Sequence, residues 1–468
     1  MRNLLTAAAF ALAAFPGAAV AQESAPPPFH SPGRPYAATG LPDRIVLTPG
    51  ATPATAMAVA FRTDARQADA VAEIALAPDG PTPGHDARQL RGQSFDITTE
   101  NGAARYHQVR FEGLTPDTAY VYRVRGAEGW SEWLQFRTAS AEARPFTFLY
   151  FGDTQNNILP IASRTIRQAF RATASPALVL HAGDLVAQRE EMVHDDEWGE
   201  WSEAGGYNYA TVPQLPAPGN HEYVDHILPD GTESRLLGPH WPLTFALPAN
   251  GAPGAERTTY FVDYQNVRFI VLDGTSAIDL GTLEAQTRWL DQTLAASRAG
   301  WNVVLFHQPI FTCARPNDTE QLNPVWRRIF EARRVDLVLQ GHDHCYSRLT
   351  APAGRDASAR DRAGGGAQGP VYIVSVTGSK MYGLNDRAET QPDRSAEMTQ
   401  LYQRIDVDGD RLVYRAFTAT GRAYDGFDLV RGTDGTNRLT ETGGPFIDPR
   451  RCRAGVGPDG GPCTAEPK

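Results

Sequence analysis

Short runs in which apolar and polar residues alternate fill the chain from residue 37 to about residue 140. They include RIVLTP, AMAVAFRT, YHQVRFEGL and AYVYRVRG, and Pro, Gly and Asp residues separate them. Alternation with a period of two is typical of strands that bury one face. The pattern predicts an all-β sandwich over residues 37–140. Tyr120 follows the Pro116–Asp117 turn at the head of a strand, where a tyrosine corner ties a sandwich loop.

The pattern changes at Arg144, where apolar strands begin to alternate with amphipathic segments. The segments SRTIRQAFRATA, EAQTRWLDQTLAASRA and NPVWRRIFEARR carry apolar residues at helical spacing. Strands that alternate with helices indicate an α/β domain, which we place at residues 144–438. Strand patterns return after about residue 370, with a hairpin turn at Asp408–Gly409, and a polar tail covers residues 439–468.

The N-terminus has the pattern of an export signal. One basic residue, Arg2, precedes an apolar Ala/Leu/Phe segment that ends at the small-residue site Ala19-Val20-Ala21. We therefore predict a cleaved signal peptide at residues 1–21, a linker at residues 22–36, and a periplasmic or extracellular location. No later run reaches the roughly 18 apolar residues that a membrane-spanning helix needs, so we expect no membrane span.

Charge and cysteine content narrow the function further. The formal net charge of −10 argues against a nucleic-acid partner, because affinity for a polyanion comes mostly from Lys and Arg. An oxidising compartment favours pairing of the even cysteine count. Cys452 with Cys463 would close the Gly/Pro-rich tail, and Cys313 with Cys345 would join two loops that each follow a His-bearing strand. Buried free thiols are the alternative.

Five apolar runs each end in residues that ligate metals. They are FLYFGD at Asp153, ALVLHAGD at Asp184, LPAPGNHE at Asn220 and His221, NVVLFH at His307, and VDLVLQGHDH at His342 and His344. A single such His is more often structural, but the ends of neighbouring strands in an α/β sheet converge on one crevice. Carboxylate, amide and imidazole groups together favour hard to borderline cations. The set predicts a two-metal site, in which a water between the cations loses a proton near neutral pH and becomes a nucleophile.

The order of these motifs, G-D, G-D, G-N-H-E, H and G-H-x-H, follows a β-sandwich that is similar to fibronectin type III-like domains. Together they resemble the purple acid phosphatase branch of the calcineurin-like metallophosphoesterases. The resemblance covers about residues 40–430 and includes GLTPDTAYVYRV, APGNHE and LVLQGHDHCYSR. It implies an α/β fold: a metallophosphoesterase β-sandwich flanked by helices, preceded by an all-β fibronectin type III-like domain. It also implies a metal-dependent phosphoric ester hydrolase.

The resemblance also implies roles for individual residues. Asp153 and His344 would hold the first metal, and Asp184 would bridge both metals. The second metal would take the remaining ligands, which are Asn220, His307 and His342. His221 would donate a proton to the leaving group or stabilise the transition state.

Two positions depart from the family pattern. Ala187 stands where purple acid phosphatases have the tyrosine that binds ferric iron and gives the colour, and Gln155 stands where more general metallophosphoesterases have a ligand His. We therefore expect no tyrosinate and no purple colour, with Fe, Zn or Mn as the two metal ions. Gln155 either ligates the first metal through its amide oxygen or hydrogen-bonds beside it while water completes the site.

The expected substrate is a small phosphorylated molecule, and Arg189, Arg315 and Tyr346 are candidate contacts because they lie near the motifs and Arg pairs bidentately with phosphate. A phosphodiesterase or nucleotidase on the same metal site is the main alternative. A weaker alternative is a non-catalytic surface-binding protein that binds its partner through the sandwich domain. A nuclease would require a basic groove, and the sequence does not indicate an oligomeric state.

Overall fold

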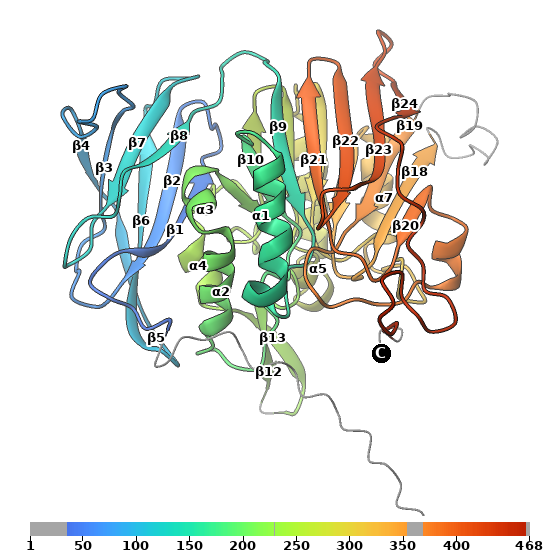
Figure 1. Cartoon of the computed structure of the whole chain (residues 1–468), viewed down its shortest axis with the longest axis horizontal. Helices are drawn as coiled ribbons and strands as arrows, with labels where there is room; N and C mark the ends of the chain where they lie inside the picture. The colour runs from blue at the N-terminus through green and yellow to red at the C-terminus, as the bar shows by residue number, and fades with distance from the viewer. Residues whose placement is uncertain (1–34, 229, 353–367, 465–468) are drawn as a thin grey trace, which may run out of the picture.

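The computed structural model describes residues 35–228, 230–352 and 368–464 (Figure 1). The expected signal peptide and nearly all of the expected linker lie outside these residues. Within the described part of the chain, no helix is both long and apolar enough to cross a membrane.

The N-terminal unit is a sandwich of two four-stranded antiparallel sheets, at the left of Figure 1. The sheet orders are β1-β2-β6-β5 and β4-β3-β7-β8. The strands are β1 (Asp43–Pro49), β2 (Ala56–Thr63), β3 (Val71–Leu76), β4 (Arg88–Arg91), β5 (Gln93–Thr99), β6 (Gly102–Glu112), β7 (Ala119–Val124) and β8 (Leu134–Arg137). The Tyr120 hydroxyl accepts a hydrogen bond from the Thr115 N–H at 2.9 Å, which confirms the tyrosine corner.

The second unit is built on a long mixed sheet whose two halves pack face to face. The sheet order is β11-β10-β9-β21-β22-β23-β24-β19-β17-β16-β15-β14. Its strands are β9 (Phe146–Phe151), β10 (Leu178–His181), β11 (Gln214–Pro216), β14 (Tyr260–Tyr264), β15 (Val267–Val271), β16 (Trp301–Leu305), β17 (Leu337–Gln340), β19 (Gln368–Val374), β21 (Leu401–Asp408), β22 (Arg411–Thr418), β23 (Ala423–Arg431) and β24 (Asn437–Glu441). The ring centroids of Phe148 in β9 and Phe269 in β15 lie 5.1 Å apart, and one buried cluster holds residues of both halves. This is the expected metallophosphoesterase β-sandwich.

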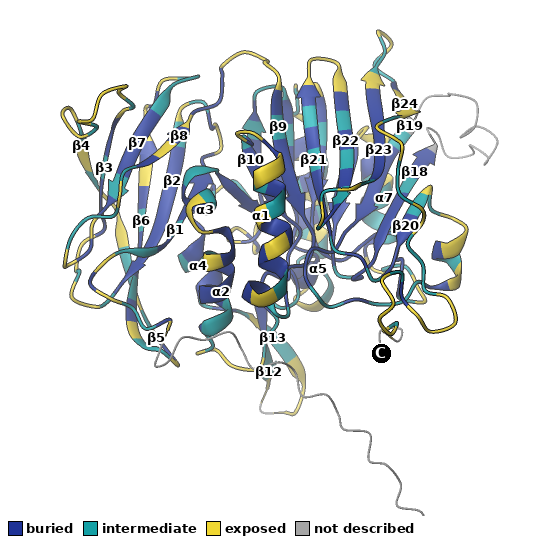
Figure 2. Ribbon diagram, viewed as in Figure 1, coloured by how far each residue is buried: buried dark blue, intermediate teal, exposed yellow. Residues whose placement is uncertain are grey.

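Helices cover both outer faces of this sandwich. Helices α1 (Ser163–Ala172) and α2 (Asp196–Gly205) pack on the β9 and β10 side, and α6 (Leu283–Ala295) and α7 (Asn323–Ala332) pack on the β15 to β17 side. The amphipathic segments therefore form the predicted helices α1, α6 and α7. The alternating buried and exposed sides of α1 are visible in Figure 2. The remaining elements are η1 (Ile158–Ala162), α3 (Tyr207–Thr211), β12 (Tyr223–Ile227), β13 (Glu233–Leu237), α4 (His240–Thr244), α5 (Gly274–Asp279), β18 (Tyr346–Pro352), η2 (Asp386–Glu389) and β20 (Arg394–Ala396).

A buried cluster of charged groups joins the two units. Arg44 of β1 donates to both carboxylate oxygens of Asp195, at 2.5 and 2.8 Å, just before α2. Arg62 of β2 reaches the same carboxylate at 3.2 Å, and His240 of α4 lies 3.0 Å from it. The four side chains are at most 5% exposed. The sandwich is thus held to the second unit by charges that both units bury.

The C-terminal segment packs onto the second unit. β24 spans the boundary expected at residue 438, and the tail after it contains the disulfide Cys452–Cys463. The second disulfide is Cys313–Cys345, so the expected pairing is confirmed and the free-thiol alternative is excluded. The hairpin turn between β21 and β22 falls at Gly409, as the sequence predicts.

Candidate metal centre

The five strand ends converge on one site. Asp153 follows β9, Asp184 follows β10, Asn220 and His221 follow β11, His307 follows β16, and the two histidines of the GHDH turn follow β17. Two groups of residues have ligand atoms within 4.8 Å of one another. One group is Asp184, His307 and His342, and the other is Asp153, Asp184 and His344. Asp184 belongs to both groups, which is the arrangement that a bridging carboxylate requires.

The ligand atoms of Asp184, His307 and His342, and of the neighbouring Asn220, lie close together. Asp184 Oδ2 is 3.1 Å from His307 Nε2, which lies 3.0 Å from His342 Nδ1. Asn220 Oδ1 is 3.2 Å from the same His307 Nε2. An amide oxygen, a carboxylate oxygen and two imidazole nitrogens that face one another form a donor set for a borderline divalent cation.

Hydrogen bonds fix the orientation of two of the imidazoles. His307 Nδ1 donates to the Ala182 carbonyl at 2.7 Å, and His344 Nδ1 donates to the Lys380 carbonyl at 2.8 Å. In the neutral form each ring therefore presents a bare Nε2, and the other ring nitrogen is held by the protein, as is usual for metal-bound histidine. His344 Nε2 lies 3.3 Å from Asp153 Oδ2.

The fit to a pair of cations is supported by buried oxygens that have no partner. Asp153 Oδ2 and Gln155 Oε1 are both inaccessible and accept no hydrogen bond. A buried carboxylate oxygen without a partner is costly, and a cation beside it removes that cost. Gln155 Nε2 donates to Asp184 Oδ2 at 2.7 Å, so the same amide already contacts the expected bridge.

The local backbone is shaped to bring these side chains together. Asp184, His342 and His344 adopt positive φ angles of 49°, 72° and 49°, a conformation that few residues other than glycine adopt. The carboxylate of Glu222 accepts the N–H groups of Gly219, Asp184 and Leu185, which holds the bridge in place. A Cβ on Gly219 would lie 2.1 Å from Asp184 Oδ1, so the close approach requires glycine.

Burial and the neighbouring charges shift the pKa values of the site's side chains. Burial raises the pKa of Asp153 to about 7. Burial would also raise the pKa of Asp184, but His307 and His221 hold it well below its usual range. Although burial lowers the pKa of His307, the Asp184 and Asp153 carboxylates outweigh it and raise the pKa to about 9. The metal-free site therefore holds a proton on His307 at neutral pH, and a cation must displace it.

His221 stands beside the ligand set. Its Nδ1 donates to the Ala187 carbonyl, and its N–H donates to Asp184 Oδ1 at 2.9 Å. Its Nε2 is 3.9 Å from Asp184 Oδ2 and faces the site. Burial lowers the pKa of His221. Ala187, at the position of the family's tyrosine, contributes only main-chain groups to these contacts.

The three candidate substrate contacts differ in their partners and in their burial. Arg189 pairs with Asp225 at 3.1 Å, and Arg315 donates to Asp343 at 2.6 Å. Tyr346 is fully buried, and its hydroxyl donates to Asp425 at 2.7 Å within the sandwich core. The prediction that Tyr346 contacts substrate is therefore corrected, because the chain enters β18 there and carries the ring away from the site.

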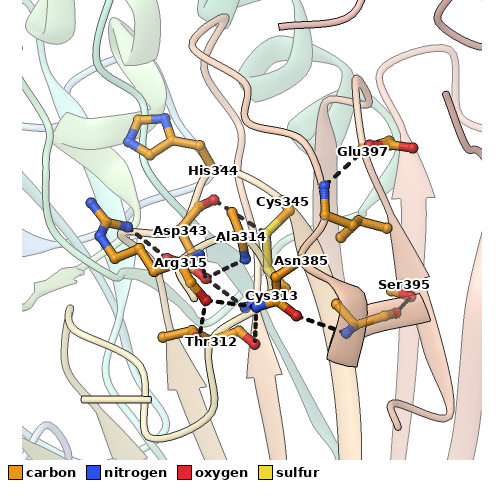
Figure 3. The surroundings of a disulfide bond; sticks show 12 residues. Thr312, Cys313, Ala314, Arg315, Asp343, His344, Cys345, Asn385, Ser395 and Glu397 are labelled. Carbon is orange, nitrogen blue, oxygen red and sulfur yellow. Dashed lines mark hydrogen bonds and ion pairs between the residues drawn. A yellow bond between two sulfur atoms is a disulfide. The ribbon is translucent and has the colours of Figure 1, made fainter. Parts of the chain in front are cut away.

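Three contacts around the GHDH turn were not predicted from the sequence. The Asp343 carboxylate accepts the N–H of Cys313 at 2.5 Å and the N–H of Ala314 at 2.7 Å, beside the Cys313–Cys345 disulfide (Figure 3). The Tyr382 ring packs on the His344 ring with centroids 4.8 Å apart. The third contact is the Lys380 carbonyl, which accepts from His344 Nδ1. The only sequence signal for this residue is that lysine is rare here, because 42 of the 44 basic residues are arginine.

Comparisons with known proteins agree with this arrangement. Residues 42–138 match the family described as purple acid phosphatase, N-terminal domain, and residues 146–346 match the calcineurin-like phosphoesterase family. The chain is 28% identical to an uncharacterized protein of Mycobacterium tuberculosis over 55% of this chain and 53% of that protein. It is 25% identical to Fe(3+)-Zn(2+) purple acid phosphatase 12 of Arabidopsis thaliana, over 62% of this chain and 63% of the relative.

The fold comparison gives the same architecture. The structure of purple acid phosphatase PPD1 from yellow lupin (Lupinus luteus) seeds aligns with a TM-score of 0.68 and 17% identity, over 84% of this chain and 75% of the lupin chain. The chain spans about half the length of the mycobacterial relative that it matches.

Proposed function

The chain belongs to the calcineurin-like phosphoesterases that carry the N-terminal domain of purple acid phosphatases, and from this premise we propose that it is an exported two-metal phosphatase without a tyrosinate ligand. Its substrates are small phosphate monoesters. The observation that carries the proposal is the convergence of two ligand groups on Asp184, beside the buried unpartnered oxygens of Asp153 and Gln155.

The residues divide into two metal positions that share Asp184. Asp153, His344 and Gln155 would hold the first metal, and Asn220, His307 and His342 would hold the second. When bound, two cations supply an acidified water and a positive field for the phosphoryl oxygens. Iron, zinc and manganese all accept this donor set, and the name of the Arabidopsis relative records iron and zinc for that protein.

His221 is the proton donor that the geometry supports. Because Nδ1 donates to the Ala187 carbonyl, Nε2 is the nitrogen that can hold or release a proton toward the leaving oxygen. The neutral ring has a bare Nε2, so donation requires the doubly protonated form. Burial lowers the pKa of His221, and the donor form is therefore populated under acidic conditions.

The absence of tyrosine at Ala187 predicts a colourless enzyme. Only the main-chain N–H and C=O of Ala187 make hydrogen bonds, to Glu197 and His221. Ala187 holds the family's tyrosine position and has no phenol to offer to the first metal. Visible spectra of the iron-loaded protein test this directly. We expect no tyrosinate charge-transfer band, and such a band would contradict the ligand assignment.

Export is supported by the chemistry of the cysteines. Both disulfides, Cys313–Cys345 and Cys452–Cys463, require an oxidising compartment to form and persist. Expression of the full chain in a bacterial host, followed by mass measurement of the mature protein, tests the proposal. We expect a product that begins at residue 22, and a full-length cytoplasmic product would contradict export.

The decisive experiment compares two chromogenic esters. The purified mature protein is assayed on nitrophenyl phosphate and on bis(nitrophenyl) phosphate, before chelation, after chelation, and after metal is restored. We expect the monoester to be hydrolysed faster, and chelation to abolish both rates. A faster diester rate would replace the proposal with a phosphodiesterase on the same metal site, and no metal-dependent turnover of either ester would refute it. Asp184→Asn is the inactive control.

A further inference from the structure

Two cationic side chains lie over one aromatic ring beside the candidate metal centre. Tyr382 packs on the ligand His344. The Lys380 ammonium lies 5.7 Å from the centroid of the Tyr382 ring, and the Arg315 guanidinium carbon lies 5.8 Å from the same centroid. The positive charges of Lys380 and Arg315 therefore lie beside the first metal position, because Tyr382 packs on His344.

Lys380 is held at this place by its own backbone. Its carbonyl oxygen accepts from His344 Nδ1 at 2.8 Å, so the residue cannot move away without releasing a metal ligand. Within the described part of the chain, no carboxylate lies within salt-bridge distance of the Lys380 ammonium.

Arg315 is only partly neutralised. Its Nη1 donates to the buried Asp343 carboxylate at 2.6 Å and to the His342 carbonyl at 2.9 Å. No described residue accepts a hydrogen bond from the remaining guanidinium nitrogens, and the side chain is 31% exposed. The edge that faces away from Asp343 is free to bind an anion in the bidentate manner of arginine.

We propose that Lys380 and Arg315 form a subsite for a second anionic group, carboxylate or phosphate, on the leaving group of the ester. This inference rests on the proposed phosphatase function and specifies its substrate class. The two metal positions neutralise the phosphoryl group that is cleaved, so the additional cations on the rim are available to a different part of the substrate. The chain then prefers esters of anionic alcohols to esters of neutral ones.

The test uses matched chromogenic substrates. Nitrophenyl phosphate is compared with two analogues that carry a carboxylate or a phosphonate on the same ring, and kcat/KM is measured with the metal-loaded full chain. The two analogues distinguish the two kinds of anion. We expect the wild-type protein to prefer at least one analogue by about tenfold, which corresponds to one charge-assisted contact of about 1.4 kcal/mol.

Lys380→Gln should remove most of this preference, measured as the ratio of kcat/KM for the analogue to kcat/KM for nitrophenyl phosphate, and the loss should appear mainly in the KM of the analogue. Lys380→Arg should restore the preference, which a purely structural role of Lys380 would not predict. Arg88→Gln is the matched control, because it removes one exposed positive charge from the N-terminal sandwich.

The outcomes separate the two proposals. If the wild-type protein hydrolyses nitrophenyl phosphate in a metal-dependent manner but shows no preference for either analogue, the subsite is refuted and the phosphatase stands. An equal loss on all three substrates in Lys380→Gln would also refute the subsite. If no ester is hydrolysed in any metal state, the phosphatase proposal itself fails.

Discussion

The carboxylate of Asp195 compensates two buried arginines, and Asp195→Asn removes that charge with little change of shape. Arg62 would keep Asp43, at 2.8 and 2.6 Å. Arg44 would keep the Tyr106 hydroxyl, at 3.0 Å, the main-chain carbonyl of residue 195 and a neutral amide oxygen, so its charge would stay buried without a directly paired carboxylate. Breaking a buried ion pair by removing one partner costs about 3–5 kcal/mol. We expect a loss of that size in the free energy of unfolding at pH 7.

Urea unfolding followed by tryptophan fluorescence measures this loss, since Trp198 stacks on His240 next to Asp195. Asp96→Asn is the control, because Asp96 is 72% exposed in its pair with Arg105 and should change stability little. His240, Arg44 and Arg62 hold the pKa of Asp195 far below its usual value, against the effect of burial. The contribution is therefore complete above an unfolded pKa of about 3.9 and is lost as pH falls further. A loss no larger than that of the control would refute the reasoning.

Three further predictions concern the site. His221→Ala should abolish the rise in rate that we expect as pH falls below about 6.5, and an unchanged pH profile would exclude His221 as the proton donor. Because His307 is protonated below a pKa of about 9, apparent Zn²⁺ affinity should fall about tenfold per pH unit between pH 8 and 7, and more steeply below pH 7, where Asp153 also takes up a proton, as measured by chelator competition. A pH-independent affinity would contradict this charge state. The double variant Cys313→Ser/Cys345→Ser opens a bond that spans 32 positions, so it should lose about 3–4 kcal/mol of stability in urea. Unchanged stability would show that the two loops hold together without it.

The convergence of the candidate metal ligands could be predicted because each one follows an apolar strand. The pairing of a buried strand fixes the edge of the sheet at which the strand ends. A ligand residue that directly follows the strand therefore lies at that edge. Asp153, Asp184 and His307 all follow this rule. The disulfide Cys313–Cys345 could be predicted for the same reason, because each cysteine comes a few residues after such an exit.

Side chains outside the strand exits were harder to place. Tyr346 is only two residues from His344, but it is the first residue of β18 and its side chain enters the core. Lys380 lies 36 positions from His344 and reaches it because the loop after β19 is held by Asp153, whose carbonyl accepts the N–H groups of Thr377 and Gly378. Sequence proximity was misleading for Tyr346, and the contact of Lys380 depends on pairing that a local pattern does not contain.

The positive φ angles of Asp184, His342 and His344 restrict how this site can change over evolution. A replacement at any of the three positions must offer a metal-binding atom and also tolerate the left-handed backbone. Asp, Asn and His are the residue types that combine both properties, whereas the ligand types Glu and Cys are not enriched in that conformation. Few amino-acid types can therefore replace these three residues during evolution. A saturation library screened for metal retention should recover few sequences, and backbone preference would account for part of that selectivity.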